Sequence, residues 1–363
     1  MLYHFLYPLH ESFSVFNVFK YITFRSVYAG LTAMLISIIT GAILIKLLVR
    51  YQIGETIREI GPKSHISKSG TPTMGGILIL SATFIAILLW GNLLNKYMWV
   101  LLLSTLSFGL LGFADDYIKV VKKKKSGIDV AMKLGIQAAI ALCVALYVVF
   151  FDTDRSVFAT QLEVPFFKNV VPDLGWFYIL FIVLVITGAS NAVNLTDGLD
   201  GLAIGPIIIA TFSFMVLTYV TGNAKFADYL NIQFISGVGE LTVFCGALIG
   251  AGLGFLWFNS YPAQIFMGDV GSLAMGGALG TLAVLSKHEL LLVIVGGLFV
   301  IEALSVILQV SYFKISGGKR IFRMTPLHHH FEEKGWSEPK VTVRFWIIAV
   351  ILALLSLSTL KLR

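Results

Sequence analysis

The sequence predicts an all-α polytopic membrane protein that forms a single domain over residues 1–363. Two observations predict this class. Hydrophobic residues make up 57% of the chain and charged residues only 13%, whereas a soluble domain carries about 25% charged residues. The apolar residues also gather into runs of roughly the length that crosses a bilayer as a helix. Most side chains are therefore expected to face lipid or one another.

These apolar runs predict about ten transmembrane helices. They fall near residues 22–49, 74–92, 97–114, 130–151, 175–193, 202–221, 239–258, 272–287, 290–312 and 341–360. The first 20 residues lack the basic start and the small-residue cleavage site of a removable signal peptide, so an interfacial segment is expected there. Cys143 and Cys245 lie far apart inside apolar runs and predict neither a disulfide framework nor a zinc site.

Lysine and arginine residues are concentrated in the connections on one side of these helices. The connections near 50–73, 115–130 and 313–340 are rich in them, and the alternate connections are poorer. The positive-inside rule places the rich connections in the cytoplasm and both termini in the periplasm. The net charge of +7 is thus a property of loops. It suits anionic lipid head groups or a phosphorylated substrate and does not imply nucleic acid.

Polar residues that apolar packing does not explain stand at the ends of several runs on the predicted cytoplasmic side. Ionisable groups at the edge of a membrane span are costly and mark functional sites. Asp115 and Asp116 end the third run in GFADDYIK, where adjacent carboxylates repel each other unless a cation or a proton intervenes. Solvated acids at a helix end are the alternative, but such acids oppose the helix dipole at a C-terminus.

The segment NLTDGLDGL between the fifth and sixth runs holds Asn194, Asp197 and Asp200. If the segment is helical, the first two of these residues share a face because they are three positions apart. A helix cap at Asp200 is the alternative interpretation, but capping explains one acid and not three polar groups.

The segment FNSYPAQIFMGDVGS between the seventh and eighth runs holds Asn259 and places Asp269 on a glycine-framed turn. Mg²⁺ takes few carboxylates from a protein and completes its shell with water and substrate phosphates. Asp269 with Asp115 or Asp116 fits that pattern, so the sequence predicts a magnesium site.

Basic and hydroxyl side chains near these motifs can each be interpreted in two ways. Lys133 lies inside the fourth run, one helical turn before Gln137; it either snorkels to the surface or complements the carboxylates or a phosphate. Lys68 and Thr73 lie before the second run, in a segment that is not a Walker A loop. They either contact a phosphate or a base, or belong to a solvated basic loop.

Three consecutive histidines, His328, His329 and His330, follow Pro326 in TPLHHHFE. In an extended strand alternate residues share a face, so all three cannot readily bind one metal ion, and the HExxH motif of zinc enzymes is absent. Contact with a phosphate or a sugar and an exposed polar loop both remain open. Glu302 is a buried-acid candidate in the ninth run, for which helix packing is an adequate explanation.

Nearly from end to end, the chain resembles the polyprenyl-phosphate N-acetylhexosamine-1-phosphate transferase superfamily. The resemblance rests on GTPTMGG, GFADDYIK, NAVNLTDGLDGLA, GFLWFNSYPAQIFMGDVGS, RIFRMTPLHHHFEEKGW and VRFWI. PLHHHFE followed by KGW resembles the subfamily that transfers phospho-N-acetylmuramoyl-pentapeptide. The resemblance implies a ten-helix, multi-pass enzyme of the bacterial inner membrane, usually a homodimer. It also implies a Mg²⁺-dependent transfer from UDP-N-acetylmuramoyl-pentapeptide to undecaprenyl phosphate, with release of UMP.

The resemblance further implies roles for individual residues. Asp269 is implied as the Mg²⁺ ligand, and Asp115, supported by Asp116, as the group that deprotonates or orients the acceptor phosphate. Lys133 and the three histidines would meet phosphates or the sugar-peptide. The uridine–diphosphate pocket would be lined by Lys68, Asn194, Asp197, Asp200, Asn259 and Phe266, the last stacking on uracil. Direct attack and a covalent aspartyl-phosphate route both remain open.

Two rival functions stay open at this point. One is transfer of N-acetylglucosamine-1-phosphate to the same lipid, against which the histidine segment argues. The other is a transporter or channel, whose polar residues would lie near the bilayer midplane. The polar residues of this chain are expected to gather at one face, which favours an enzyme. Phosphoryl transfer requires mainly positioning and charge neutralisation, and such a site can meet a soluble nucleotide and a lipid phosphate together.

Overall fold

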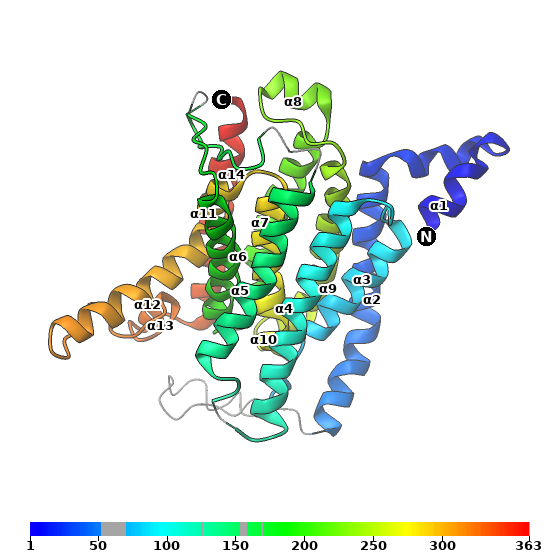
Figure 1. Cartoon of the computed structure of the whole chain (residues 1–363). Helices are drawn as coiled ribbons and strands as arrows, with labels where there is room; N and C mark the ends of the chain where they lie inside the picture. Colours follow the sequence, from blue (N-terminus) through cyan, green and yellow to red (C-terminus); the bar gives the residue numbers. More distant parts are fainter. Residues whose placement is uncertain (52–69, 125, 153–157, 168–169, 363) are drawn as a thin grey trace.

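The computed structural model describes residues 1–51, 70–124, 126–152, 158–167 and 170–362. In these residues the structure is a bundle of helices, which confirms the predicted all-α class (Figure 1). The helices are α1 (Leu2–Leu6), η1 (Tyr7–Glu11), η2 (Ser14–Lys20), α2 (Ile22–Arg50), α3 (Gly76–Trp90), α4 (Lys96–Val120), α5 (Val130–Leu146), η4 (Tyr147–Phe151), α6 (Phe177–Thr196), α7 (Ile204–Thr221), α8 (Ala224–Leu230), η6 (Val238–Glu240), α9 (Leu241–Asn259), α10 (Gly268–Leu285), α11 (Glu289–Val295), α12 (Gly297–Ile315), α13 (Leu327–Glu332) and α14 (Glu338–Leu362).

The ten predicted runs correspond to the long helices of the bundle. Within the described ranges, nine helices are long and apolar enough to cross a membrane, and α3 is a shorter apolar helix beside them. The run predicted at 290–312 is divided at Gly296, where the backbone leaves helical geometry between α11 and α12. Beyond this break α12 turns away from the bundle and projects sideways with α13 (Figure 1).

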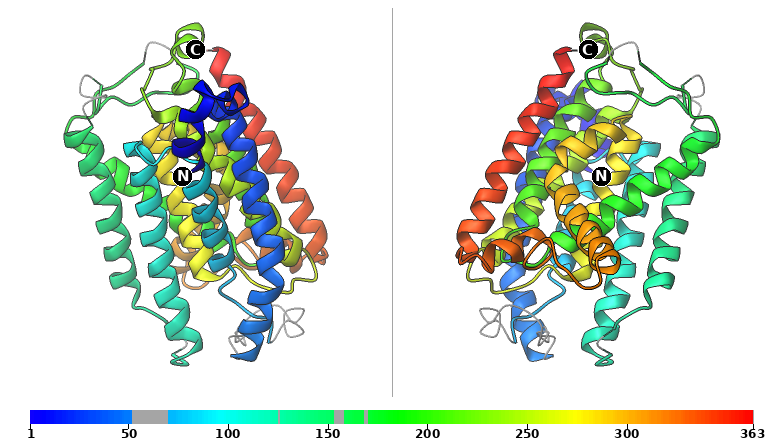
Figure 2. Two further views of the ribbon diagram at one scale, coloured as in Figure 1. Left: turned by 90° about the vertical axis from the view of Figure 1, so that its right-hand side faces the viewer. Right: turned by 90° about the vertical axis from the view of Figure 1, so that its left-hand side faces the viewer.

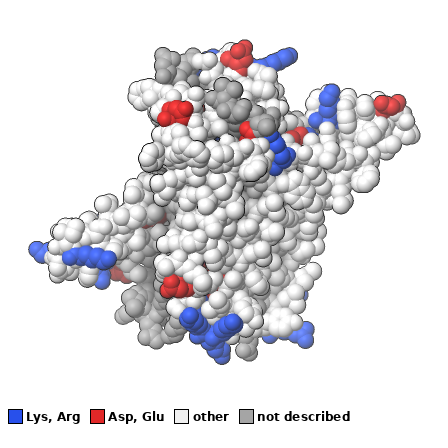
Figure 3. Space-filling view, in the orientation of Figure 1, with Lys and Arg blue, Asp and Glu red and all other residues white. Residues whose placement is uncertain are grey.

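The charged side chains lie at the two ends of the bundle. Figure 3 shows Lys and Arg at the lower end, at the end of α12 and along the upper edge, whereas the middle of this face is almost entirely uncharged. The start of α2 and the C-terminus lie toward the upper end, and the connection between α4 and α5 lies at the lower end (Figure 1). Which of these ends faces the cytoplasm stays a prediction from the positive-inside rule.

Glycines allow the central helices to approach one another closely. A Cβ atom on Gly246 or Gly250 of α9 would overlap the backbone of Ser26 or Gly30 in α2. Between membrane helices the apolar side chains gain little by avoiding lipid, so close packing of small residues supplies much of the attraction. The contact between α2 and α9 therefore depends on the absence of side chains there.

Glycines also allow close packing around α10, which is buried along almost its whole length. A Cβ atom on Gly76 of α3 would overlap the backbone of Gly271, and one on Gly112 of α4 would overlap the backbone of Asp269. Gly276 lies equally close to the backbone of α6 at Ala189. Three neighbouring helices thus hold the first turns of α10 at backbone contact distance.

Buried polar networks tie the upper end together. Lys287, which follows α10, donates to the carbonyl oxygens of Ala159 and Gln161 at 2.6 and 2.8 Å and to the Tyr178 hydroxyl at 2.9 Å. That hydroxyl also hydrogen-bonds Glu289. These contacts satisfy charged groups that would otherwise be costly to bury, and they fix the end of α10 that lies farthest from Asp269.

Filling the α2–α9 contact should destabilise the bundle. Gly250→Val would force a side chain against the backbone of Gly30, and overpacking of this kind costs about 1–3 kcal/mol. We expect a lower melting temperature in detergent micelles, followed by tryptophan fluorescence. The matched control is Gly188→Val in α6, where an added Cβ meets no atom within 4 Å. Equal melting temperatures for the two variants would contradict this view of the contact.

Candidate active site

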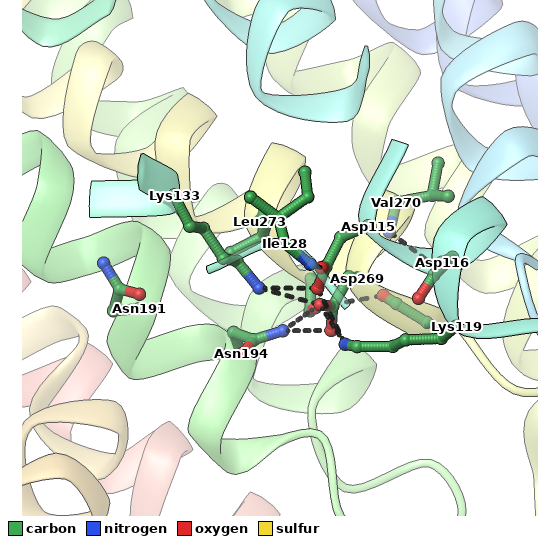
Figure 4. Close-up of polar contacts among 12 residues, drawn as sticks. Asp115, Asp116, Lys119, Ile128, Lys133, Asn191, Asn194, Asp269, Val270 and Leu273 are labelled. Atoms are coloured by element: carbon green, nitrogen blue, oxygen red, sulfur yellow. Dashed lines mark hydrogen bonds and ion pairs between the residues drawn. The ribbon is translucent and has the colours of Figure 1, made fainter. Parts of the chain in front are cut away.

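Carboxylates and lysines from three helices meet near the lower end of the bundle (Figure 4). The Nζ atom of Lys119, on α4, lies 2.7 Å from Asp115 Oδ2 and 2.8 Å from Asp269 Oδ2. The Nζ atom of Lys133, on α5, lies 3.1 and 2.7 Å from the same two oxygens. Both ammonium groups therefore bridge the two carboxylates. Of the two interpretations of Lys133, contact with the carboxylates is the one that the structure shows.

Hydrogen bonds hold the remaining carboxylate oxygens. Asn194 donates from Nδ2 to Asp269 Oδ1 at 2.8 Å and is also 2.8 Å from Ser272 Oγ. The backbone N–H of Ile128 donates to Asp115 Oδ1 at 2.6 Å. Backbone N–H groups and amides that point at fixed oxygens make these carboxylates rigid.

Asp116 accepts a hydrogen bond from the backbone N–H of Val270 at 3.1 Å. It is 5% exposed, and Asp115 is 2% exposed. This burial excludes solvated helix-end acids as an explanation. Three carboxylates and two ammonium groups leave the cluster one formal negative charge, so it is suited to accept a divalent cation or a proton.

The predicted end of the third run at residue 114 is wrong, because α4 continues to Val120. The polar residues DDYIK were expected to leave the helix. Instead Lys119 pairs with Asp115 one turn earlier, an arrangement that supports a helix. Lys119 is also the functional candidate that the sequence analysis missed, since it was counted only as a loop charge. In the sequence, its four-residue spacing from Asp115 indicates that the two side chains can pair on one helix face.

The segment 194–200 is divided between helix and loop. Asn194 belongs to α6, which ends at Thr196, and Asp197 follows as the first residue outside the helix. The alternative interpretation of Asp200 as a helix cap is excluded, because α7 begins at Ile204 after Ala203. The shared helical face expected for Asn194 and Asp197 is not formed.

Asp200 instead connects two loops to the C-terminal helix. Its Oδ2 atom accepts from the backbone N–H of Ala263 at 2.9 Å, and its own N–H donates to Glu338 Oε1 at 2.7 Å. Two residues of α14 add contacts, as Thr342 donates to the Asp200 carbonyl oxygen and Trp346 to the Gly201 carbonyl oxygen. The carboxylate therefore shapes the connection that leads to Asp269.

Asn259, like Asp200, holds this loop through hydrogen bonds. It accepts from the N–H of Gly201 at 3.1 Å and donates to the carbonyl oxygen of Ile265 at 2.8 Å. It is 4% exposed. These contacts position the loop, and a direct contact of Asn259 or Asp200 with a nucleotide stays a prediction.

The segment before α3 lies against the segment before α10. Phe266 donates its N–H to the Pro72 carbonyl oxygen at 2.8 Å and accepts from Gly75 at 2.8 Å. Thr73 is buried, and its Oγ1 atom lies beside Gly268, whose positive φ of 71° places it in the region that favours glycine. Stacking of Phe266 on a base stays a prediction. Lys68 lies outside the described residues.

The three histidines lie in the short helix α13, so the extended segment expected for them is wrong. His329 Nδ1 lies 2.8 Å from Glu332 Oε2, and His330 Nδ1 accepts from the N–H of Arg323 at 3.1 Å. His328 is buried, and its ring lies so close to Gly198 that a Cβ atom there would overlap it. The three imidazoles thus have three different environments.

Glu302 holds α13 against α12. Its carboxylate accepts from the N–H groups of Leu327 and His328 at 2.7 and 3.1 Å and lies 3.4 Å from His328 Nδ1. Burial lowers the pKa of His328, and the nearby Glu302 carboxylate opposes that shift only in part. The imidazole is therefore neutral at pH 7. Glu302, left unassigned from the sequence, positions the histidine segment.

Within the part of the chain that the structure describes, no three His, Cys, Asp or Glu side chains are grouped as an all-protein metal cage. Mg²⁺ needs no such cage, because one or two carboxylates suffice when phosphate oxygens and water complete its octahedron. The carboxylates of Asp115 and Asp269 meet at the same two lysines and are hard oxygen donors, so this pair fits Mg²⁺.

The chain is similar to known proteins over its full length. The model of glycosyl transferase family 4 matches residues 98–287, and signature 1 of phospho-N-acetylmuramoyl-pentapeptide-transferase matches residues 68–80. Relatives of that name from Syntrophus aciditrophicus and Thermodesulfovibrio yellowstonii are 56% and 57% identical over 363 residues. The relative from Desulfatibacillum aliphaticivorans is 59% identical over 367 residues. All three alignments cover 100% of both chains.

The apolar helical bundle, its buried cluster and the family model together define a membrane glycosyl transferase. Within this class, the chain belongs to the phospho-N-acetylmuramoyl-pentapeptide-transferase family.

Removing the Glu302 carboxylate should release α13. Glu302→Ala leaves two backbone N–H groups without their charged acceptor, and hydrogen bonds to charged groups contribute about 1.5–3 kcal/mol each. We expect faster tryptic cleavage after Arg320 or Arg323, measured by mass spectrometry of the purified protein. Glu333→Ala, which alters an exposed acid at the end of the same helix, should cleave as the wild type does. Identical cleavage of both variants would remove Glu302 from this role.

Proposed function

We propose that this chain transfers phospho-N-acetylmuramoyl-pentapeptide from UDP to undecaprenyl phosphate and releases UMP. The observation that carries the proposal is the pair of lysines bridging Asp115 and Asp269 at one end of a membrane-embedded bundle. The name shared by the full-length relatives supports phospho-N-acetylmuramoyl-pentapeptide as the transferred group.

The cluster is suited to phosphoryl transfer because its charges can be rearranged around phosphates. The reaction requires positioning of the two phosphates and neutralisation of their charge. Lys119 and Lys133 already hold ammonium groups beside one another, and each can exchange a carboxylate contact for a phosphate oxygen. The freed Asp115 carboxylate then fits the role of orienting or deprotonating the acceptor phosphate. Direct attack and a covalent aspartyl-phosphate are both compatible with this arrangement.

Mg²⁺ dependence is part of the proposal. Asp269, with Asp115 or Asp116, would hold the ion, which would offset the charge of the donor diphosphate and of the transition state. The first turn of α10 presents Asp269, and Asn194 fixes the orientation of its carboxylate. Within this chain, the two lysines and the Asn194 amide position the groups that react.

Release of UMP tests the proposed activity. Purified protein with UDP-N-acetylmuramoyl-pentapeptide, undecaprenyl phosphate and Mg²⁺ should release UMP and form a lipid-linked product. UDP-N-acetylglucosamine should release little in the same assay. UMP release from UDP-N-acetylglucosamine alone would favour the rival transferase, and ion-coupled uptake into vesicles without UMP release would favour a transporter.

The substitution Asp269→Asn tests whether the activity depends on Mg²⁺ bound at this carboxylate. It should lower turnover at least about 100-fold, because removal of one preorganised charge contact has effects of that size. The thermal stabilisation that Mg²⁺ gives to the wild-type protein should be lost as well, while the melting temperature without Mg²⁺ stays near that of the wild type. Wild-type turnover in excess EDTA would exclude the metal.

We also place the protein in the bacterial inner membrane, with both termini in the periplasm and the cluster on the cytoplasmic face; a homodimer stays an expectation. The lysine-rich connection between α4 and α5 lies at the end of the bundle opposite the C-terminus (Figure 1), which supports this orientation. A reporter fused after Arg363 should be active only if it works in the periplasm. Activity of a cytoplasmic reporter at that position would reverse the orientation.

A further inference from the structure

A hydrogen bond between the buried amide of Gln137 and the partly buried amide of Asn191 joins α5 to α6. Gln137 is 0% exposed, and its Oε1 atom accepts from Asn191 Nδ2 at 2.7 Å. Asn191 Nδ2 also donates to the backbone carbonyl oxygen of Thr187 at 2.8 Å. A backbone carbonyl oxygen accepts only, so the orientation of the Asn191 amide is fixed, and Gln137 must present its oxygen to it.

This pair lies one helical turn from Lys133 and Asn194, two of the side chains that hold Asp269. Gln137 follows Lys133 by four residues on α5, and Asn191 precedes Asn194 by three residues on α6, so each shares a helix face with its neighbour. Lys133 contacts Asp269 Oδ2 at 2.7 Å and Asn194 contacts Oδ1 at 2.8 Å. Figure 4 shows Asn191, Lys133 and Asn194 on the same side of the carboxylates. The separation of α5 and α6 therefore decides whether Lys133 and Asn194 can both reach Asp269, to which Lys119 of α4 also binds.

Apart from the contacts of Lys133, the packing of α5 is made by small apolar side chains. Figure 2 shows this helix at the edge of the bundle, and its buried residues besides Gln137 are Ala141, Val144 and Ala145. On the outer side the two helices leave an apolar groove, lined by residues such as Leu142 of α5 and Leu180 of α6. Small apolar contacts of this kind allow a helix to slide or rotate, whereas a hydrogen bond between amides specifies one alignment.

The composition of the pair argues against a role in stability alone. Among the described residues, Gln137 Nε2 has no hydrogen-bond partner, and burying an unsatisfied donor lowers stability. An apolar residue would avoid that cost. We propose that the Gln137–Asn191 hydrogen bond is a clasp that positions Lys133 and Asn194 around Asp269. Both amides are positioning residues, and their effect on turnover rests on the transfer reaction proposed above.

Gln137→Met tests the clasp, because methionine keeps the length of the side chain and lacks the hydrogen bond. We expect kcat to fall about tenfold, since small displacements of positioning groups slow catalysis. KM for the nucleotide donor should change less than about twofold, and the melting temperature should not fall. Without any substrate, Lys133 should react faster with acetic anhydride, followed by mass spectrometry, because its carboxylate contacts are loosened.

Two comparisons sharpen the test. Leu142→Met introduces the same residue on the outer face of α5 and should leave kcat and Lys133 labelling unchanged. Gln137→Met combined with Asn191→Leu should lose no more activity than the more damaging single change, since one hydrogen bond can be lost only once.

Unchanged kcat and unchanged Lys133 labelling in Gln137→Met would overturn the clasp. A lower melting temperature with normal kcat would overturn it as well and leave a packing role. If the wild-type protein fails to release UMP, the proposed function fails on its own. Lys133 labelling then still decides whether the amide pair positions that lysine.

Discussion

The close backbone contact between α4 and α10 is the constraint on which the site depends. Gly112 leaves no room for a side chain against Asp269, so the first turn of α10 lies directly beside the helix that carries Asp115 and Asp116. Gly76 sets the same distance from the other side, against Gly271. Placing carboxylates from separate helices together against their repulsion requires a rigid frame, and backbone packed on backbone is more rigid than interlocking side chains that can change rotamer.

The two lysines reduce the repulsion between these carboxylates. Lys119 and Lys133 each touch both Asp115 and Asp269, so repulsion between the carboxylates is converted into two bridged contacts in surroundings where charge interactions are strong. A buried cluster of this kind contributes little net stability because of its desolvation cost. Its presence is better explained by chemistry that needs mobile positive groups beside fixed negative ones. The same groups that neutralise the carboxylates are then at hand for phosphates.

Much of this fold was predictable from sequence, since apolar runs of bilayer length specify helices almost independently of context. The departures have local causes. Lys119 extends α4 through its pairing with Asp115, which an apolar window does not register. Gly296 divides α11 from α12, a break that the glycine pair at 296–297 does not by itself predict inside a long apolar run. The candidate residues were found by their polarity, but polarity does not separate a carboxylate that faces lysines from one, such as Asp200, that accepts from a loop N–H. That distinction depends on contacts between residues distant in the chain, as does the role of Glu302.

The contacts of Asp200 with α14 have a consequence for biosynthesis. Glu338, Thr342 and Trp346 fix the loop that contains Asp200 and Gly201, and this loop in turn holds the connection leading to Asp269. During translation the helices that carry the carboxylates and lysines emerge and insert well before α14. A nascent chain can therefore bring the carboxylates and lysines together while the loop behind them is still unsupported. Completion of the site coincides with insertion of the last helix, so a ribosome that stalls late in synthesis leaves an inserted but incompletely ordered enzyme in the bilayer.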